Sequence, residues 1–149
     1  MVKSIGVSNF NKSQLEDVLK NCKIKPVVNQ IEAHIYLQNT DLIKFCQDNE
    51  IVCVAYGPIG APNRTPFNPE DPVLLEDELV KKLTKKYSKT PGQICLKWAV
   101  QQNIVVIPKS TTPVRIRENA ELFDFKISDD DMNELRGLDR SFRIYALKQ

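Results

Sequence analysis

The residues best suited to chemistry lie in the segment 107–122, where cationic and hydroxyl side chains gather at a predicted helix start. Lys109, Ser110 and Thr111 follow a short apolar run, and Arg115 falls on the first turn of the helix. An ammonium, a guanidinium and hydroxyls at a helix N-terminus suit a phosphate, because all of them donate hydrogen bonds to an anion. A solvated helix start is the alternative interpretation of the same residues.

Other polar or aromatic residues stand at the ends of three further apolar runs. Ser8 and Asn9 follow the first run, Asn29 and Gln30 lie towards the end of the second, and Tyr56 ends the third. If the runs are parallel strands, their carboxyl ends meet at one edge of a sheet, where α/β proteins build binding sites. The plainer alternatives are a helix-entry turn for Ser8-Asn9 and an ordinary strand-end aromatic for Tyr56.

Strand and helix signals alternate along the chain and would position these residues. Apolar runs predict strands at 5–7, 26–31, 51–56 and 104–107, and apolar residues at helical spacing predict helices that begin near residues 13, 40, 75, 90, 113 and 128. This alternation predicts parallel strands joined by right-handed crossovers. Because the runs are apolar rather than alternating, both faces of the sheet are predicted to be covered.

Four of the helix starts carry a predicted cap. Ser13 and Glu16 have the spacing of a capping box, and Thr40, Thr90 and Ser128 stand where an N-cap residue is expected. The segment 57–72 contains five prolines and is predicted to be an irregular binding loop or lid.

Two architectures fit this order of elements: a small doubly wound sheet and part of a (β/α)₈ barrel. No GxGxxG motif follows the first strand, so the dinucleotide fingerprint of the doubly wound class is absent. A barrel commonly places a phosphate site in the loops after its last two strands, which matches 57–60 and 109–115. A complete barrel needs eight strands, typically in ~250 residues. The 149 residues therefore predict an α/β fold with about four strands, a half-barrel with two unpaired edges.

Composition excludes several classes of protein. A net charge of +2 is too small to favour nucleic acid or a membrane surface, and no apolar run approaches the ~20 residues of a membrane span. The four scattered cysteines, Cys22, Cys46, Cys53 and Cys95, are predicted to be buried free thiols, which favours a reducing compartment and the cytoplasm. His34 is the single histidine, so no metal site is expected.

Four motifs together resemble the aldo-keto reductases, which are NADPH-dependent carbonyl reductases built on a (β/α)₈ barrel. The motifs are KSIGVSNF at 3–10, PVVNQIEAH at 26–34, VAYGPIG at 54–60, and IPKS at 107–110 followed by Arg115, Glu118, Asn119 and Leu122. The resemblance runs from Lys3 to about Arg140, and the last motif is specific because it fixes several polar identities over one strand-to-helix junction. It implies that the chain is the C-terminal half of the barrel, one partial domain over residues 1–149.

The resemblance also implies a role for each candidate position. Ser8, Asn9 and Gln30 would hydrogen-bond the nicotinamide carboxamide, and the nicotinamide ring would stack on Tyr56. The remaining cofactor contacts implied are Gly57 and Ile59 in the 57–60 strap over the pyrophosphate, Lys109, Ser110, Thr111 and Arg115 around the 2′-phosphate of NADPH, and Glu118 and Asn119 at the adenine.

The same resemblance implies that no residue of this chain is catalytic. In the family, a tyrosine acid works with a lysine, an aspartate and a histidine, and all four belong to the first half of the barrel, upstream of Met1. The tyrosines of this chain lie outside that motif, and His34 matches a structural stretch. Substrate preference is harder to infer, because Pro66-Phe67 stands where many members carry a tryptophan, and the chain is short after Arg140.

The expected function is therefore NADPH-dependent reduction of aldehydes or ketones, with this chain supplying the cofactor-binding half. Alone it is expected to be inactive, as a partial gene model or splice form would be. One alternative is a non-catalytic NADPH-binding module that associates with itself or a partner through its open barrel edges. Another is a structural role of the lens-crystallin type.

Overall fold

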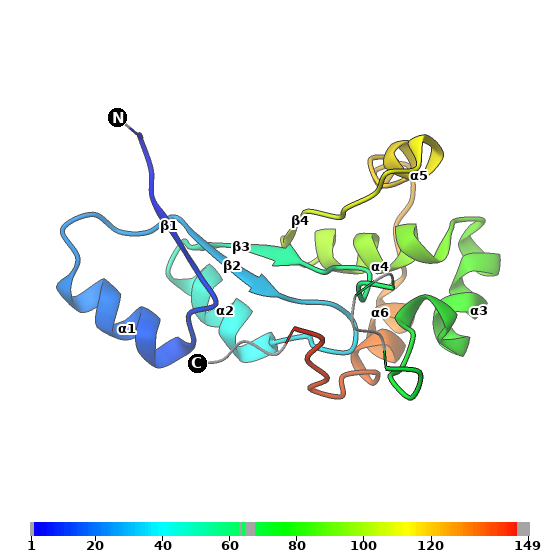
Figure 1. Ribbon diagram of the computed structural model, residues 1–149, viewed down its shortest axis with the longest axis horizontal. Coiled ribbons are helices and arrows are strands. Elements are labelled where there is room, and N and C mark those ends of the chain that lie inside the picture. Colours follow the sequence, from blue (N-terminus) through cyan, green and yellow to red (C-terminus); the bar gives the residue numbers. More distant parts are fainter. Residues whose placement is uncertain (1, 63, 65–67, 146–149) are drawn as a thin grey trace.

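A four-stranded parallel sheet forms the centre of the protein (Figure 1). The computed structural model describes residues 2–62, 64 and 68–145. The strands, which lie side by side in chain order, are β1 (Gly6–Ser8), β2 (Val28–Glu32), β3 (Val52–Tyr56) and β4 (Val105–Val106). Each neighbouring pair is parallel. The prediction of an α/β fold with parallel strands, consistent with part of a (β/α)₈ barrel, is confirmed, and each strand begins one or two residues later than predicted.

Helices fill the connections between the strands, as parallel pairing requires. They are α1 (Lys12–Asn21), α2 (Thr40–Asp48), the short 3₁₀ helix η1 (Leu74–Glu76), α3 (Glu78–Tyr87), α4 (Pro91–Val100), α5 (Pro113–Glu118) and α6 (Asp129–Arg136). In Figure 1, α1 and α2 lie together on one side of the sheet, and α5 stands apart from both. The helix predicted to begin near residue 75 is instead the 3₁₀ turn followed by α3.

Two of the predicted caps are wrong by one or two residues. Helix α1 is capped by Asn11, whose side chain accepts from the backbone N–H of Gln14 at 2.9 Å, while the Gln14 side chain accepts from the N–H of Asn11. Asn11 comes first because the chain turns into the helix immediately after Asn9, which has a left-handed φ of 59°. Helix α2 begins at Thr40 itself, with Asn39 before it.

The other two caps are confirmed. The Thr90 hydroxyl accepts from the N–H of Gln93, and the Gln93 side chain accepts in return from the N–H of Thr90, which completes a capping box at α4. The Ser128 hydroxyl accepts from the N–H of Asp131 at the start of α6. Both polar groups satisfy backbone donors that have no partner within the helix.

Among the described residues, only one face of the sheet is covered, so the prediction of cover on both faces is wrong. Along β3, Cys53 and Ala55 are buried, whereas the alternating residue Val52 is 45% exposed. Val105 on β4 is 48% exposed. Successive side chains of a strand point to opposite faces, and four strands cannot close the barrel that would enclose the second face.

The core lies between the covered face and the helices. Its largest fully buried side chains include Trp98, Leu15, Ile35 and Leu83. All four cysteines are free thiols, and three of them are buried as predicted, while Cys22 is only partly buried. Within the described residues, no helix is both long enough and apolar enough to cross a membrane.

Candidate cofactor site

The carboxyl ends of the first three strands bring the predicted nicotinamide contacts together. Ser8 is the register partner of Gln30 in the parallel pair β1–β2. The Ser8 hydroxyl donates to the Gln30 carbonyl oxygen at 2.9 Å, and the backbone N–H of Asn9 donates to the same oxygen at 2.8 Å. In the pair β2–β3, Tyr56 is the register partner of Glu32. Residues far apart in the chain therefore share one edge of the sheet.

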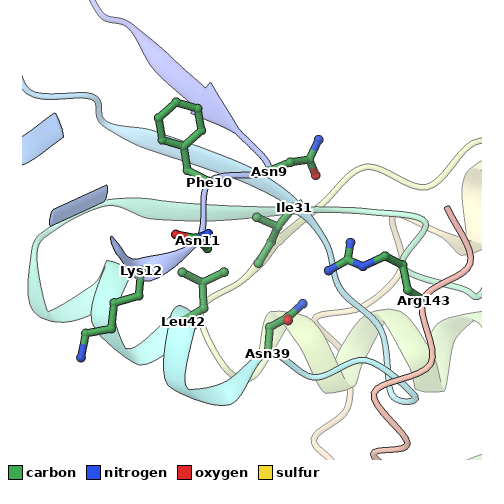
Figure 2. A pocket seen from close by; sticks show the side chains of 8 residues that line it. All are labelled: Asn9, Phe10, Asn11, Lys12, Ile31, Asn39, Leu42 and Arg143. Carbon is green, nitrogen blue, oxygen red and sulfur yellow. The ribbon is translucent and has the colours of Figure 1, made fainter. Parts of the chain in front are cut away.

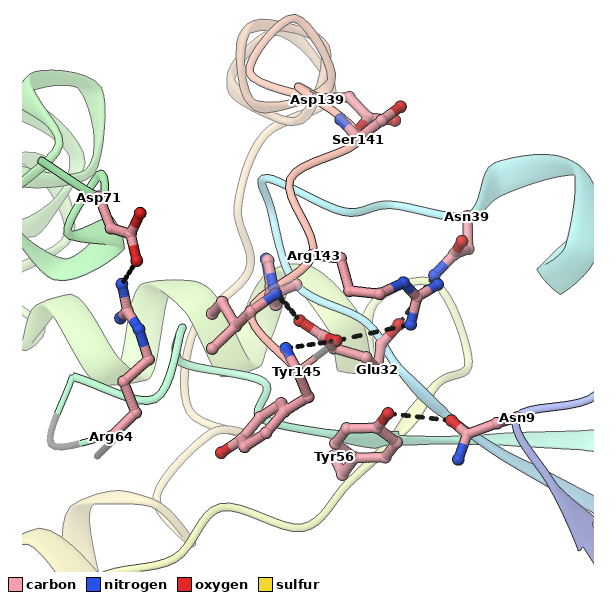
Figure 3. Close-up of polar contacts among 12 residues, drawn as sticks. Asn9, Glu32, Asn39, Tyr56, Arg64, Asp71, Asp139, Ser141, Arg143 and Tyr145 are labelled. Carbon is pink, nitrogen blue, oxygen red and sulfur yellow. Dashed lines mark hydrogen bonds and ion pairs between the residues drawn. The ribbon is translucent and has the colours of Figure 1, made fainter. Parts of the chain in front are cut away.

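Tyr56 and Asn9 are joined directly across this edge (Figure 3). The Tyr56 hydroxyl donates to Asn9 Oδ1 at 2.9 Å, and Asn9 Nδ2 donates to the Ser8 hydroxyl at 3.2 Å. The pKa of the Tyr56 phenol is raised, first by burial and then by the nearby Glu32 carboxylate, while Arg143 acts in the opposite direction. A neutral phenol keeps the proton that this hydrogen bond needs.

Asn29, a fully buried amide on β2, holds the turn that carries Asn9. Asn29 Nδ2 donates to the Phe10 carbonyl oxygen at 3.0 Å, and Asn29 Oδ1 accepts from the Phe10 N–H at 3.4 Å. A buried amide that satisfies both backbone groups of one residue fixes that residue, because an unpaired buried polar group is costly. Asn29 was recognised in the sequence only as a strand-end polar residue.

The predicted strap after β3 begins with a tight turn. Gly57 and Gly60 both have positive φ, at 60° and 77°, and the Gly60 N–H donates to the Gly57 carbonyl oxygen at 2.9 Å. A Cβ on Gly60 would lie 2.8 Å from Leu74 Cβ, so glycine is required there. Ile59 is partly buried and packs against the core.

Beyond the turn, the proline-rich loop is irregular where it is described, as predicted. Arg64 and Asp71 form an ion pair at 2.6 Å across the loop (Figure 3). The predicted difference at Pro66-Phe67 lies outside the described residues.

The second group of predicted contacts follows β4 and is far more open. Lys109, Thr111 and Arg115 are exposed, and Ser110 is partly buried, with its hydroxyl accepting from the N–H of Thr112 at 3.2 Å. The helix that carries Arg115, α5, has no buried residue.

Glu118 and Asn119, the two predicted adenine contacts, are partly buried at the end of α5. Gln93 of α4 ties this end down, because its side-chain amide donates to the carbonyl oxygens of Glu118 and Glu121 at 3.2 and 3.0 Å. Since β4 neighbours β3 in the same parallel sheet, both groups of predicted contacts follow carboxyl ends of adjacent strands.

Three residues of this region had no place in the sequence prediction: Glu32, Arg143 and Tyr145. The Glu32 carboxylate is fully buried and contacts the segment 143–145, and the Tyr145 ring lies against Tyr56 with centroids 5.6 Å apart (Figure 3). The available signal was an acidic residue inside an apolar strand, two positions after Gln30. Apart from His34, its side-chain partners are more than 100 residues away in the chain, so spacing could not reveal them.

A cavity of about 510 Å³ opens beside the turn after β1 (Figure 2). It is lined by Asn9, Phe10, Asn11, Lys12, Ile31, Asn39, Leu42 and Arg143. Of the predicted cofactor contacts, only Asn9 lines it. The predicted site is therefore an edge of the sheet rather than this cavity.

His34 is fully buried, and its Nε2 lies 3.2 Å from Glu32 Oε1. No cluster of three or more histidine, cysteine, aspartate or glutamate residues able to hold a metal ion occurs in the part of the chain that the structure describes. The structural role of His34 stays a prediction.

The fold and the strand-end residues define a class: an α/β protein whose parallel strands are consistent with part of a (β/α)₈ barrel, with polar residues at the carboxyl edge of the sheet. The profile of the Aldo/keto reductase family matches residues 1–140, and the chain belongs to this family.

Similar relatives extend the same finding. Aldo-keto reductase family 1 member D1 of Mus musculus is 48% identical over 150 residues, covering 99% of this chain and 46% of the relative. Member A1 of Gallus gallus is 45% identical over 143 residues, and member A1 of Homo sapiens is 41% identical over 143 residues, each match covering 96% of this chain and 44% of the relative. The chain therefore spans about half the length of the curated relatives it matches.

Proposed function

We propose that this chain is the NADPH-binding half of an aldehyde or ketone reductase. The observation that carries the proposal is the joined set Ser8, Asn9, Gln30 and Tyr56 at the carboxyl ends of three parallel strands. Membership of the family supports an oxidoreductase. In such a reaction, a hydride passes from the reduced cofactor to the carbonyl carbon, and a proton is delivered to the carbonyl oxygen to give an alcohol.

The joined set has the donors and acceptors that a nicotinamide needs. Its carboxamide presents one acceptor oxygen and one NH₂ donor, which the side chains of Ser8, Asn9 and Gln30 can match. Tyr56 offers an aromatic face on which a planar ring can stack. Bound NADPH would supply the hydride, while these residues would hold and orient the ring.

The exposed group of predicted contacts after β4 supports selection of NADPH over NADH. A phosphomonoester carries close to two negative charges at neutral pH and several acceptor oxygens. Lys109 and Arg115 are exposed cations on either side of the hydroxyls of Ser110 and Thr111 in the chain. We propose that these four residues bind the 2′-phosphate, which NADH lacks, with Glu118 and Asn119 at the adenine and the 57–60 turn at the pyrophosphate.

We propose further that these 149 residues do not turn over a carbonyl substrate by themselves. The Tyr36 hydroxyl donates to Asp77 at 2.6 Å, and the Tyr87 hydroxyl donates to Asp131, so both serve structural hydrogen bonds. Tyr56 is the proposed stacking surface. Because the family's tyrosine acid belongs to the first half of the barrel, we propose that the proton donor comes from residues outside this chain.

The test is to compare this chain with a version preceded by the first half of a related barrel. The decrease of NADPH absorbance in the presence of a generic aldehyde measures turnover. We expect turnover only with the extended protein, and NADPH binding with both. Measurable turnover by the 149-residue chain would contradict its proposed inactivity, and absence of NADPH binding in both would contradict the cofactor assignment.

A non-catalytic NADPH-binding module is the second candidate, favoured by the open sheet. β1 and β4 are edge strands, and the exposed valines Val52 and Val105 lie on strands next to each other. Pairing of these edges with a second copy would cover both features. Sedimentation of the purified chain tests this: a folded dimer supports the module, and a monomer contradicts self-association.

The free cysteines support a reducing compartment, and we propose the cytoplasm as the location of this protein.

A further inference from the structure

Glu32 is a buried carboxylate that contacts His34, with its Oε1 3.2 Å from His34 Nε2, and takes its other partners from the segment 140–145. Its side chain is 0% exposed. Oε1 accepts from the backbone N–H of Ile144 at 2.6 Å, and Oε2 accepts from the N–H of Tyr145 at 3.2 Å. The Arg143 guanidinium lies 3.5 Å from Oε2. Because a buried charge is stable only when it is paired and hydrogen-bonded, Glu32 holds this segment in place.

A second anchor holds the start of the same segment. The Tyr36 carbonyl oxygen accepts from the backbone N–H groups of Arg140 and Phe142, at 3.1 and 3.0 Å. The Arg140 guanidinium also lies over the Tyr36 ring, 4.3 Å from its centroid. The segment 140–145 is therefore fixed at both ends by groups that follow or end β2.

These anchors place the Tyr145 ring beside Tyr56, the proposed stacking surface for the nicotinamide (Figure 3). The ring centroids of Tyr145 and Tyr56 are 5.6 Å apart and the ring planes meet at 66°, an edge-to-face contact. A Cβ on Gly57 would lie 3.2 Å from Tyr145 Cε2, so the glycine leaves room for the ring. Tyr145 remains 40% exposed, so the ring can turn away without unpacking the core.

We propose that Tyr145 is an intramolecular occupant of the nicotinamide site, held by Glu32 against Tyr56 and displaced when the cofactor ring stacks there. The inference rests on the proposed role of Tyr56. A stacked nicotinamide needs van der Waals contact with the Tyr56 ring, and the Tyr145 ring already makes an edge-to-face contact with this ring. Binding of NADPH must therefore displace the Tyr145 ring, which lowers the affinity of the chain for NADPH.

The experiment measures dissociation constants of the 149-residue chain for NADPH and for 2′,5′-ADP, which carries the 2′-phosphate but no nicotinamide. In Tyr145→Ala we expect NADPH to bind about 3- to 10-fold more tightly, as loss of one aromatic pair predicts. Binding of 2′,5′-ADP should not change. Tyr145→Phe retains the ring and should bind NADPH as the unmodified chain does. Phe123→Ala, which removes an exposed aromatic ring outside the site, is the matched control and should change neither constant.

The outcomes separate the two proposals. If both ligands bind but Tyr145→Ala binds NADPH equally or more weakly, Tyr145 does not compete with the cofactor and this inference is wrong, while the cofactor assignment stands. If neither ligand binds to any variant, the cofactor assignment fails and the inference fails with it. If NADPH binding tightens in Tyr145→Ala alone, both are supported. Circular dichroism of each variant establishes that it is folded.

Discussion

The two groups of proposed cofactor contacts differ in how firmly the protein holds them. The nicotinamide group is built into the sheet: Ser8, Gln30 and Tyr56 lie on paired strands, and hydrogen bonds join them through Asn9. The residues proposed to bind the 2′-phosphate lie in a loop and on α5, a helix with no buried residue. One end is organised before any ligand arrives, whereas the other end has exposed cations that a ligand would have to order.

This difference has a physical reason. A ring that reacts must be held in one orientation, and rigid strands position groups more precisely than loops do. A phosphate is recognised mainly by charge, which acts over a longer distance and tolerates mobile lysine and arginine side chains. Mutations in the two groups should therefore affect different quantities, folding stability in the first and cofactor affinity in the second.

The largest expected effect is on stability, at Asn29, the buried amide that holds the turn carrying Asn9. Asn29→Ala leaves the N–H and the carbonyl oxygen of Phe10 without their buried partner and creates a small cavity, so we expect a loss of about 3 kcal/mol in the free energy of unfolding. Ser110→Ala, the matched change among the proposed phosphate-binding residues, should lower the free energy of unfolding by less than about 0.5 kcal/mol. Chemical denaturation measures both. Equal losses would remove the contrast between the two groups.

The next effect is on cofactor affinity, among the residues proposed to bind the 2′-phosphate. Arg115→Ala should weaken NADPH binding by about 1.5–3 kcal/mol, because one charge-assisted hydrogen bond to the phosphate is lost, and should leave NADH binding nearly unchanged. Arg117→Ala, an exposed arginine of the same helix that is not among the proposed contacts, is the control. Titration with both cofactors measures the effect. Equal weakening for the two cofactors would rule out a 2′-phosphate contact.

A smaller effect is expected from Tyr56→Phe, which keeps the ring and removes the hydrogen bond to Asn9. It should cost about 0.5–1.5 kcal/mol of stability at neutral pH. Because burial raises the pKa of the Tyr56 phenol, the folded protein keeps this proton above about pH 10, where the unfolded chain loses it. This contribution to stability is complete below pH 10 and is lost as the pH rises further.

Denaturation at pH 8 and at pH 11 should accordingly show a shallower alkaline loss in Tyr56→Phe than in the unmodified chain. Tyr36→Phe is a useful comparison, because burial and its hydrogen bond to Asp77 also raise the pKa of Tyr36, outside the site. The same alkaline loss in Tyr56→Phe and the unmodified chain would mean that the Tyr56 phenol titrates alike in both states.

The smallest effect is expected at the adenine end. Asn119→Ala should weaken NADPH and NADH binding by the same amount, about 0.5–1.5 kcal/mol, since both cofactors carry the adenine. Gln93, which holds this end of α5, is left intact by the change. A loss confined to NADPH would move Asn119 from the adenine to the phosphate.

Much of this protein follows from local sequence. The cap-then-proline start of α4 at Thr90 and the serine cap of α6 at Ser128 form as predicted, because each cap needs only a few neighbouring residues. The apolar runs give the four strands and their parallel order. The cap of α1 was predicted two residues too late, because the left-handed turn at Asn9 brings Asn11 into the capping position first.

Other features depend on contacts between distant residues. Neither the open face of the sheet at Val52 and Val105 nor the pairing of Asn29 with Phe10 can be read from hydrophobic runs, because runs do not tell which face a neighbouring element covers. The partly buried Cys22 was predicted to be buried for the same reason.

The sequence by itself determined the parallel α/β order, the family resemblance and the identity of the strand-end residues, because periodicity and motifs are properties of short segments. Only the tertiary structure decided that Glu32 would bind the backbone of Ile144 and Tyr145, more than 100 residues away, and that Tyr145 would lie on Tyr56. A buried carboxylate takes its partners from whatever chain the fold brings to it, and that choice is made in three dimensions.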